Sequence, residues 1–174
     1  MKTRMAIALV SLALSVGAFA QDQESSPELK KLDRYLGTWA YDGEDTTPVT
    51  GGRVTCEAHR RWISRGSFVE SHRDCKTPRG DVTQVEVFGY DFQRRVYLYW
   101  GFNVRVVSTY TASSMDGDTV IWTGIGSSSG NRCTEVFASG FASSTDKCET
   151  SRDGGNSWVL RSGGTSTKSA SNAR

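Results

Sequence analysis

The sequence predicts an all-β protein: a single antiparallel, up-and-down barrel of about ten short strands, preceded by one short helix. The first reason is that alternating β-branched and aromatic residues recur in short runs, with turn-forming Gly, Asp, Asn and Ser between them. The second is that leucines at helical spacing occur once, near the start. A sheet of about ten consecutive antiparallel strands is either open or closed into a barrel. Closure leaves no edge strand with unpaired backbone groups, so a barrel is favoured.

The stretch 82–102 carries the strongest strand signal, with seven of the chain's eighteen aromatic residues. A polar break at 91–94 divides it into a hairpin, and a two-residue turn at 92–93 sets the expected pairs. These are Val87 with Leu98, Val85 with Trp100, Phe88 with Tyr97, and Glu86 with Tyr99. One face is apolar and the other is aromatic with polar groups, which is typical of a small barrel around a cavity.

Residues 1–20 are predicted to be a secretory signal peptide. Lys2 and Arg4 precede an apolar run at 5–16, and 18–20 has the small-x-small pattern of a cleavage site. The apolar run is too short to span a membrane. Gln21 follows the expected cut, which does not fit a lipoprotein. We therefore expect an exported protein, periplasmic or secreted.

The rest of the chain is expected to form one domain, 21–163, followed by a disordered tail, 164–174, rich in Ser and Thr. Of 21 basic and 19 acidic residues, two basic ones belong to the predicted signal, so the mature charge is balanced. Bulk charge therefore gives no reason to expect a nucleic acid or an anionic membrane as partner.

The helix is predicted at about 26–36. Ser26 can cap it, Pro27 suits its first turn, and Gly37 ends it. Leucines at helical spacing give it one apolar face. We expect this helix to cover one end of the sheet.

Four cysteines lie in the predicted mature chain, and export with an even count favours two disulfides. A two-residue turn at 65–66 places Cys56 opposite Cys75 in one hairpin. A turn centred between residues 140 and 141 places Cys133 opposite Cys148 in another. We predict these two pairings.

The two histidines, His59 and His72, should also lie opposite each other in the first of these hairpins. One hypothesis is a metal or haem site. The alternative is a solvated, charged sheet face, with Trp62 and Val69 on the buried side. Charged neighbours on the same face favour the alternative.

A resemblance to known proteins appears at the start of the barrel. A helix followed by Gly37-Thr38-Trp39 resembles the Gly-x-Trp opening of lipocalins and the wider calycin group. The resemblance implies that Arg161 packs on Trp39 and closes the barrel. The chain is also similar to a bacterial family of unknown function with calycin-like barrels, in its motifs at 36–39, 88–91 and 151–155. This likeness implies a fold and a small-ligand cavity, and no established activity.

A second motif, Ser151-x-Asp153-x-Gly155-x-x-Trp158, resembles the Asp-box of sialidases. That motif stabilises a hairpin: the Asp side chain ties the turn and the Trp packs beneath it. A sialidase propeller needs several such repeats, and this chain is too short for one. We expect a structural turn.

The candidate ligand-binding residues are those on the polar aromatic face of the central hairpin. They are Glu86, Phe88, Tyr97 and Tyr99, with Arg105 as a possible counter-charge for an acidic ligand. No catalytic motif stands out, so an enzyme is not favoured, and no cofactor is expected.

Three functional hypotheses remain open at this stage. The first is an exported barrel that binds a small, mostly apolar molecule. The second is a haem, metal or enzymatic barrel that uses His59 and His72. The third is a filled barrel that acts through its surface as a structural or interaction protein. Fold alone does not choose among them.

Overall fold

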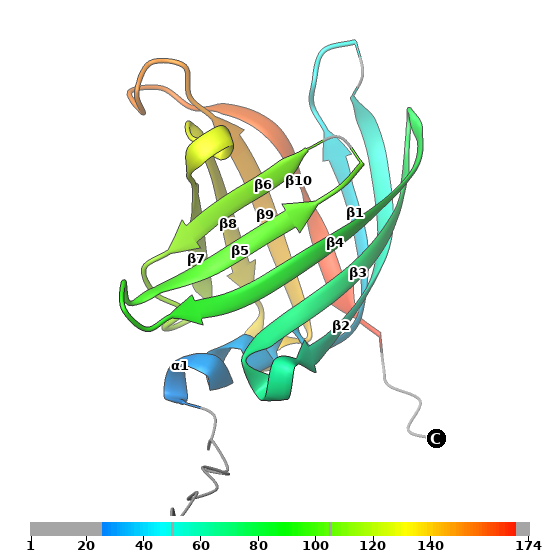
Figure 1. The fold of residues 1–174 in the computed structure, drawn as a ribbon. Helices are drawn as coiled ribbons and strands as arrows, with labels where there is room; N and C mark the ends of the chain where they lie inside the picture. The colour runs from blue at the N-terminus through cyan, green and yellow to red at the C-terminus, as the bar shows by residue number, and fades with distance from the viewer. Residues whose placement is uncertain (1–25, 50, 105, 170–174) are drawn as a thin grey trace, which may run out of the picture.

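The computed structural model describes residues 26–49, 51–104 and 106–169. They form a closed antiparallel barrel of ten strands in which successive strands pair and β10 returns to pair with β1 (Figure 1). The predicted fold class is therefore confirmed. The predicted signal peptide lies outside the described residues, as do Arg105 and residues 170–174.

The strands and helical turns follow one another with short connections. The strands are β1 Gly37–Asp45, β2 Gly52–Ile63, β3 Phe68–Thr77, β4 Gly80–Asp91, β5 Val96–Phe102, β6 Val107–Ala112, β7 Thr119–Gly124, β8 Asn131–Phe137, β9 Ser143–Thr150 and β10 Val159–Lys168. The helical segments are α1 Pro27–Lys30, η1 Lys31–Tyr35, η2 Ser64–Gly66, η3 Gly126–Ser128 and η4 Ser139–Phe141. None of these described helices has the length or apolar character needed to cross a membrane.

The N-terminal segment α1–η1 closes one end of the barrel, as the sequence predicts (Figure 1). The Ser26 hydroxyl caps it by accepting a hydrogen bond from the Leu29 backbone N–H at 3.2 Å. Only its first turn is α-helical, and the rest is a 3₁₀ helix. Leu29, Leu32 and Tyr35 are almost fully buried, so this end of the barrel is filled with side chains.

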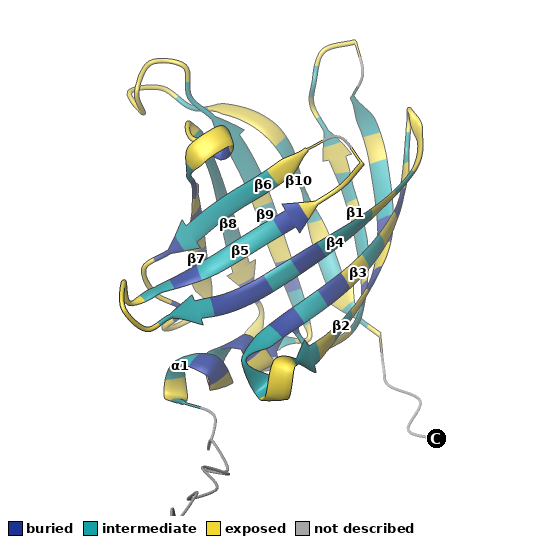
Figure 2. Ribbon diagram, in the orientation of Figure 1, coloured by how far each residue is buried: buried dark blue, intermediate teal, exposed yellow. Residues whose placement is uncertain are grey.

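Buried and exposed residues alternate along the strands, so each strand has one inward and one outward face (Figure 2). The inward apolar residues pack beside α1–η1 and include Trp39, Val69, Phe88, Val120 and Phe137.

The two predicted disulfides are present. Cys56 pairs with Cys75 across β2 and β3, and Cys133 with Cys148 across β8 and β9. In both hairpins the two cysteines are direct partners in the strand register.

The central hairpin differs from its predicted register by two residues. Its turn has four residues, 92–95, rather than two, and Arg95 adopts a positive φ of 56°. The Asp91 carboxylate stabilises the turn by accepting hydrogen bonds from two backbone N–H groups, each at 2.9 Å. Phe88 therefore pairs with Tyr99. A shift of two positions keeps every side chain on its predicted face.

The last strand is longer than the sequence suggests. β10 runs to Lys168, through residues expected to be a disordered tail, and pairs with both β1 and β9. Gly164 faces a crowded position, where a Cβ would lie 2.6 Å from the Gly43 Cα and 2.7 Å from the Tyr41 ring. The small residues of β10 allow it to pack closely against β1. A segment of this composition is also typical of a flexible tail.

The side chains that pack on Trp39 where the barrel closes differ from the one that the resemblance implies. The Trp39 ring is covered by the Lys168 ammonium, 4.9 Å from the ring centroid, and by the Arg60 guanidinium at 5.6 Å. Arg161 is exposed and donates a hydrogen bond to the Thr47 hydroxyl at 3.2 Å. The reason is the longer β10, which places Lys168 opposite Trp39 in the strand register.

The Asp-box-like segment forms the turn between β9 and β10. The Ser157 backbone N–H donates to the Asp153 carboxylate at 2.9 Å, and the Gly155 N–H donates to the Ser151 hydroxyl at 2.8 Å. The Trp158 indole N–H donates to the Gly155 carbonyl at 3.1 Å. These contacts lie within the turn itself, away from the barrel interior.

Candidate functional site: the barrel cavity

A cavity of about 260 Å³ lies inside the barrel. Aromatic rings form one part of its wall: Tyr35, Tyr41, Phe88, Tyr99, Tyr110 and Trp122. Charged side chains form another: Arg60, Arg73, Glu86, Glu135 and Asp146. Five ionisable groups inside one small barrel are uncommon, because isolated buried charges are costly.

The strand period explains why these charges point inward. On β2, Arg60 has the same facing as Cys56, and on β3, Arg73 has the same facing as Cys75. On β8 and β9, Glu135 and Asp146 are two residues from the second disulfide and are direct partners in the register. Each disulfide thus marks the inward face of its hairpin.

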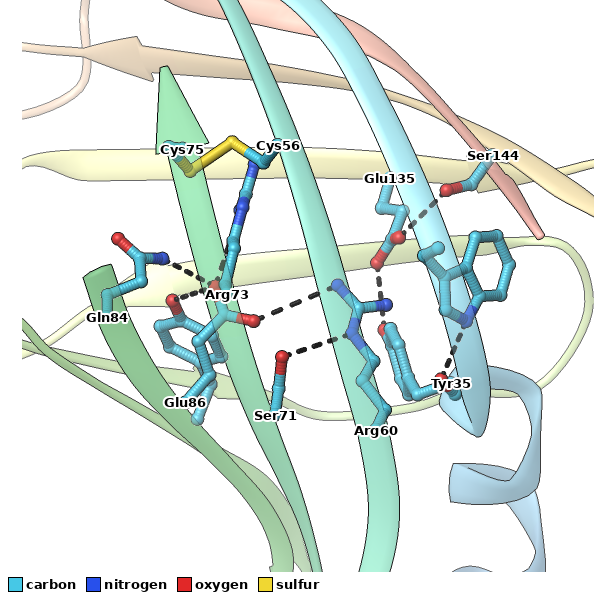
Figure 3. Close-up of polar contacts among 12 residues, drawn as sticks. Tyr35, Cys56, Arg60, Ser71, Arg73, Cys75, Gln84, Glu86, Glu135 and Ser144 are labelled. Atoms are coloured by element: carbon cyan, nitrogen blue, oxygen red, sulfur yellow. Dashed lines mark hydrogen bonds and ion pairs between the residues drawn. A yellow bond between two sulfur atoms is a disulfide. The ribbon is translucent and has the colours of Figure 1, made fainter. Parts of the chain in front are cut away.

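The Arg73–Glu86 ion pair is buried inside the barrel, with side-chain exposures of 22% and 3%. The Arg73 guanidinium lies 3.3 Å from Glu86 Oε1, which also accepts hydrogen bonds from Gln84 at 2.7 Å and from the Tyr99 hydroxyl at 3.2 Å (Figure 3). Burial raises the pKa of Glu86, but the charges of Arg73 and then Arg60 outweigh it, so the pKa is lowered. Glu86 is therefore held as a carboxylate.

Near this pair, one carboxylate oxygen and the terminal nitrogens of one guanidinium have no hydrogen-bond partner among the described residues. Glu86 Oε2 is buried and accepts none, although the Arg60 guanidinium lies 3.8 Å from it. Arg60 donates through Nε to the Ser71 hydroxyl at 3.4 Å, and its terminal nitrogens donate no hydrogen bond to the described residues. Buried polar groups of this kind are usually satisfied by protein, water or ligand.

The second pair of carboxyl groups has a different electrostatic setting. Glu135 accepts a hydrogen bond from the Tyr35 hydroxyl at 2.8 Å and one from the Ser144 hydroxyl at 3.0 Å (Figure 3). Burial raises the pKa of Glu135. Burial, followed by the charge of Glu135, raises the pKa of Asp146 to about 6. No hydrogen bond or ion pair from the described residues reaches the Asp146 carboxyl.

The raised pKa of Asp146 predicts a pH-dependent gain in stability on substitution. Its folded pKa of about 6 exceeds the ordinary value of 3.8. Wild-type stability therefore falls as pH rises from about 4 to about 6, because the unfolded chain releases this proton first. Asp146→Asn should remove that loss and raise the free energy of unfolding by up to about 3 kcal/mol at pH 8.

Urea denaturation at pH 5 and at pH 8 measures this effect. The gain should be clearly smaller at pH 5. The control is Asp118→Asn, which changes an exposed aspartate between β6 and β7. A gain from Asp146→Asn that is equal at both pH values, or a loss at pH 8, would contradict the prediction.

The structure brings together most of the predicted ligand-binding residues. Glu86, Phe88 and Tyr99 line the cavity. Tyr97 points to the same side but lies near the helix-covered end, against Tyr90 at a ring distance of 4.9 Å, and does not line the cavity. The facing of Arg105 stays a prediction.

The histidines lie outside the barrel. The side chains of His59 and His72 are 60% and 53% exposed, and their Nε2 atoms lie 2.8 Å from Glu57 and 3.3 Å from Glu70, respectively. They do not line the cavity. Across residues 26–49, 51–104 and 106–169, no group of three or more His, Cys, Asp or Glu is placed to hold a metal ion.

Four charged cavity residues are not among the candidates from the sequence: Arg60, Arg73, Glu135 and Asp146. The sequence does contain a pattern that indicates their inward facing, because each lies an even number of positions from a cysteine on the same strand. The inward facing of the disulfides would then have placed all four inside.

Comparisons with known proteins identify the architecture. No protein-family model and no curated protein matches this chain. Among solved structures, the chain is similar to the crystal structure of Rv2717c from M. tuberculosis, with a TM-score of 0.59 and 10% sequence identity. The match covers 83% of this chain and 99% of that one. At this identity, the likeness shows the fold alone.

Proposed function

We propose that this protein binds a small molecule with an aromatic or apolar body and a polar group inside the barrel. The observation that carries the proposal is the cavity, in which rings and charged side chains share one small volume. Its size is somewhat below the roughly 300–1,000 Å³ of typical ligand sites. A molecule of one or two fused rings suits it better than a long lipid chain.

The polarity of the wall changes the expected ligand. The sequence suggested a mostly apolar molecule, but Arg60, Glu86 and Asp146 offer charged or hydrogen-bonding groups to whatever enters. Orientation in such a site comes from a few polar contacts, while the rings supply contact area. A purely apolar ligand would leave these groups desolvated and unpaired.

Access is expected at the barrel end opposite α1. A second hollow of about 290 Å³ lies there and shares Tyr41, Arg73 and Ser162 with the cavity. The end covered by α1–η1 is filled with buried side chains. A ligand would therefore enter between the loops at the uncovered end (Figure 1).

We also propose that the protein works after export. Two disulfides are stable in an oxidising compartment, and cytosolic reductants would tend to remove them. A periplasmic or secreted ligand-binding protein would meet both requirements.

Titration with a neutral aromatic probe tests the binding proposal. 2-Naphthalenemethanol should bind with a stoichiometry of one, measured by calorimetry on the mature chain. Ser108→Phe should weaken binding about 10-fold or more, because Ser108 lines the cavity and a ring there would occupy part of it. The matched control on the same strand is Val107→Phe, where the side chain is exposed. Equal affinity in both variants would contradict binding inside the barrel.

A further inference from the structure

We propose that the ligand of this cavity is a small organic monocation, such as an arylalkylamine. Its charged group would lie against Asp146 and its aromatic body against the rings of the same cavity. This inference rests on the proposed ligand-binding function and names the chemical class of the ligand.

The balance of charge on the cavity wall favours a cation. With every group ionised, Glu86, Glu135 and Asp146 supply three negative charges, against two positive charges from Arg60 and Arg73. Arg73 and Glu86 neutralise each other directly at 3.3 Å. One negative charge is in excess in that state. The raised pKa values of Glu135 and Asp146 show that burial disfavours this excess charge, and a ligand with one positive charge would balance it.

Open hydrogen-bond acceptors point to the same class. Asp146 receives no hydrogen bond from the described residues. Glu86 lines the same cavity and is only 2% exposed, and its buried Oε2 atom has no hydrogen-bond partner in the described part of the chain. An ammonium group carries three donors and no acceptor, so it can satisfy such oxygens. Hydrogen bonds between an ammonium and a carboxylate are among the stronger ones in proteins.

Aromatic rings beside Asp146 add a second attraction for a cation. Tyr41 lies near enough for the charge of Asp146 to contribute to raising the pKa of its hydroxyl to about 12, after the larger effect of burial. Tyr110 and Trp122 line the same cavity. Ring faces attract cations most strongly where water is displaced.

An anionic ligand would meet a less favourable site. Its natural partner would be Arg60, whose terminal nitrogens donate no hydrogen bond to the residues that the structure describes. However, Glu86 Oε2 already lies 3.8 Å from that guanidinium. The charge of Arg60 also acts on Glu135 and Asp146, lowering the pKa of each against the larger effect of burial. A ligand carboxylate placed there would be repelled by three carboxyl groups.

The groups that face Asp146 define how binding should depend on pH. The charged ones are Glu135 from β8, Arg73 from β3, Arg60 from β2 and Glu86 from β4, and the hydroxyl of Tyr41 from β1 also lies within reach of its charge. Burial and these four charged groups set the pKa of Asp146 at about 6, so Asp146 is charged at neutral pH and loses its charge below that value. The affinity for a cation should therefore fall as pH drops through about 6.

Three probes with one ring system test the inference on the unmodified mature chain. They are 2-naphthylmethylammonium, neutral 2-naphthalenemethanol and anionic 2-naphthoate. At pH 7.5 the cation should bind about 10-fold more tightly than the alcohol, and the anion should bind most weakly. At pH 5 the advantage of the cation should shrink several-fold while the affinity for the alcohol stays constant.

Substitution then assigns the effect to one residue. Asp146→Asn should abolish the preference for the cation, so that 2-naphthylmethylammonium binds no more tightly than 2-naphthalenemethanol. Asp118→Asn, at an exposed position, should leave both affinities unchanged.

Each contrary outcome has a distinct meaning. If cation and alcohol bind equally to the wild type, the cavity binds ligands but the inference is overturned. Tighter binding of 2-naphthoate overturns it in favour of Arg60 as the anchor. If none of the three binds, both the inference and the proposed function are contradicted.

Discussion

Arg73→Met should lower the free energy of unfolding by roughly 3–5 kcal/mol at neutral pH. Arg73 is the main charge that keeps Glu86 ionised inside the barrel, and Glu86 is only 2% exposed. Removing the guanidinium leaves a buried carboxylate without its partner, and protonating or hydrating that carboxylate costs free energy. Chemical denaturation of the variant and the wild type measures the loss.

Two further variants distinguish the effect of breaking the ion pair from the effect of replacing the aliphatic part of the Arg73 side chain. The double variant Arg73→Met/Glu86→Gln removes both charges and should recover much of the loss. Arg53→Met breaks the exposed pair between Arg53 and Asp42 and should change stability little. If Arg73→Met were no more destabilising than Arg53→Met, the buried pair would have no special role.

Loss of both disulfides should lower the free energy of unfolding by more than Arg73→Met does. Each bridge closes a short loop, with sequence separations of 19 and 15 residues, and the chain-entropy model assigns about 3 kcal/mol to each. Removing both should therefore cost roughly 6 kcal/mol, a large part of the roughly 5–15 kcal/mol that stabilises a typical domain. Denaturation with and without a reducing agent measures this cost.

Paired substitutions show which bridge is responsible. Cys56→Ala/Cys75→Ala and Cys133→Ala/Cys148→Ala should each cost about half of the total. The variant that lacks all four cysteines should be insensitive to reductant. A wild-type protein equally stable with and without reductant would refute the prediction.

Local sequence patterns predicted a large part of this fold. The strand period and the tight turn near Gly66 placed Cys56 opposite Cys75, and the structure has that pair. The capped N-terminal segment was placed correctly for the same reason, since Ser26 and Pro27 act within one turn. Features set by neighbours in the chain can be found from the chain alone.

Features that depend on distant strands were harder to predict. The pairing of β1 with β10 joins the two ends of the barrel and puts Lys168, rather than Arg161, on Trp39. No local pattern specifies that register. The predicted strand register of the central hairpin was wrong by two residues for a local reason. Arg95 adopts the positive φ that a glycine usually provides, so nothing in the sequence indicated the longer turn.

The sequence predicted only some of the residues that line the cavity. Glu86 and Tyr99 were found because aromatic neighbours surround them. Arg60 and Asp146 were missed because charged residues on a strand usually face water, and only the facing of the cysteines contradicts that here. Burial of charge reflects the function or the electrostatics of a particular site, which general composition rules do not describe.

The positions of the disulfides have a consequence for how the chain folds. Each bridge joins residues that lie directly across from one another on neighbouring strands. If β2 slid by one residue against the rest of the barrel, its side chains would exchange sides: His59 would enter the interior and Arg60 would face water. A bridge between residues 56 and 75 cannot form in that arrangement without distortion. Oxidation therefore favours the native register within each of the two hairpins, because a bridge forms only when its two cysteines lie on the same side of neighbouring strands.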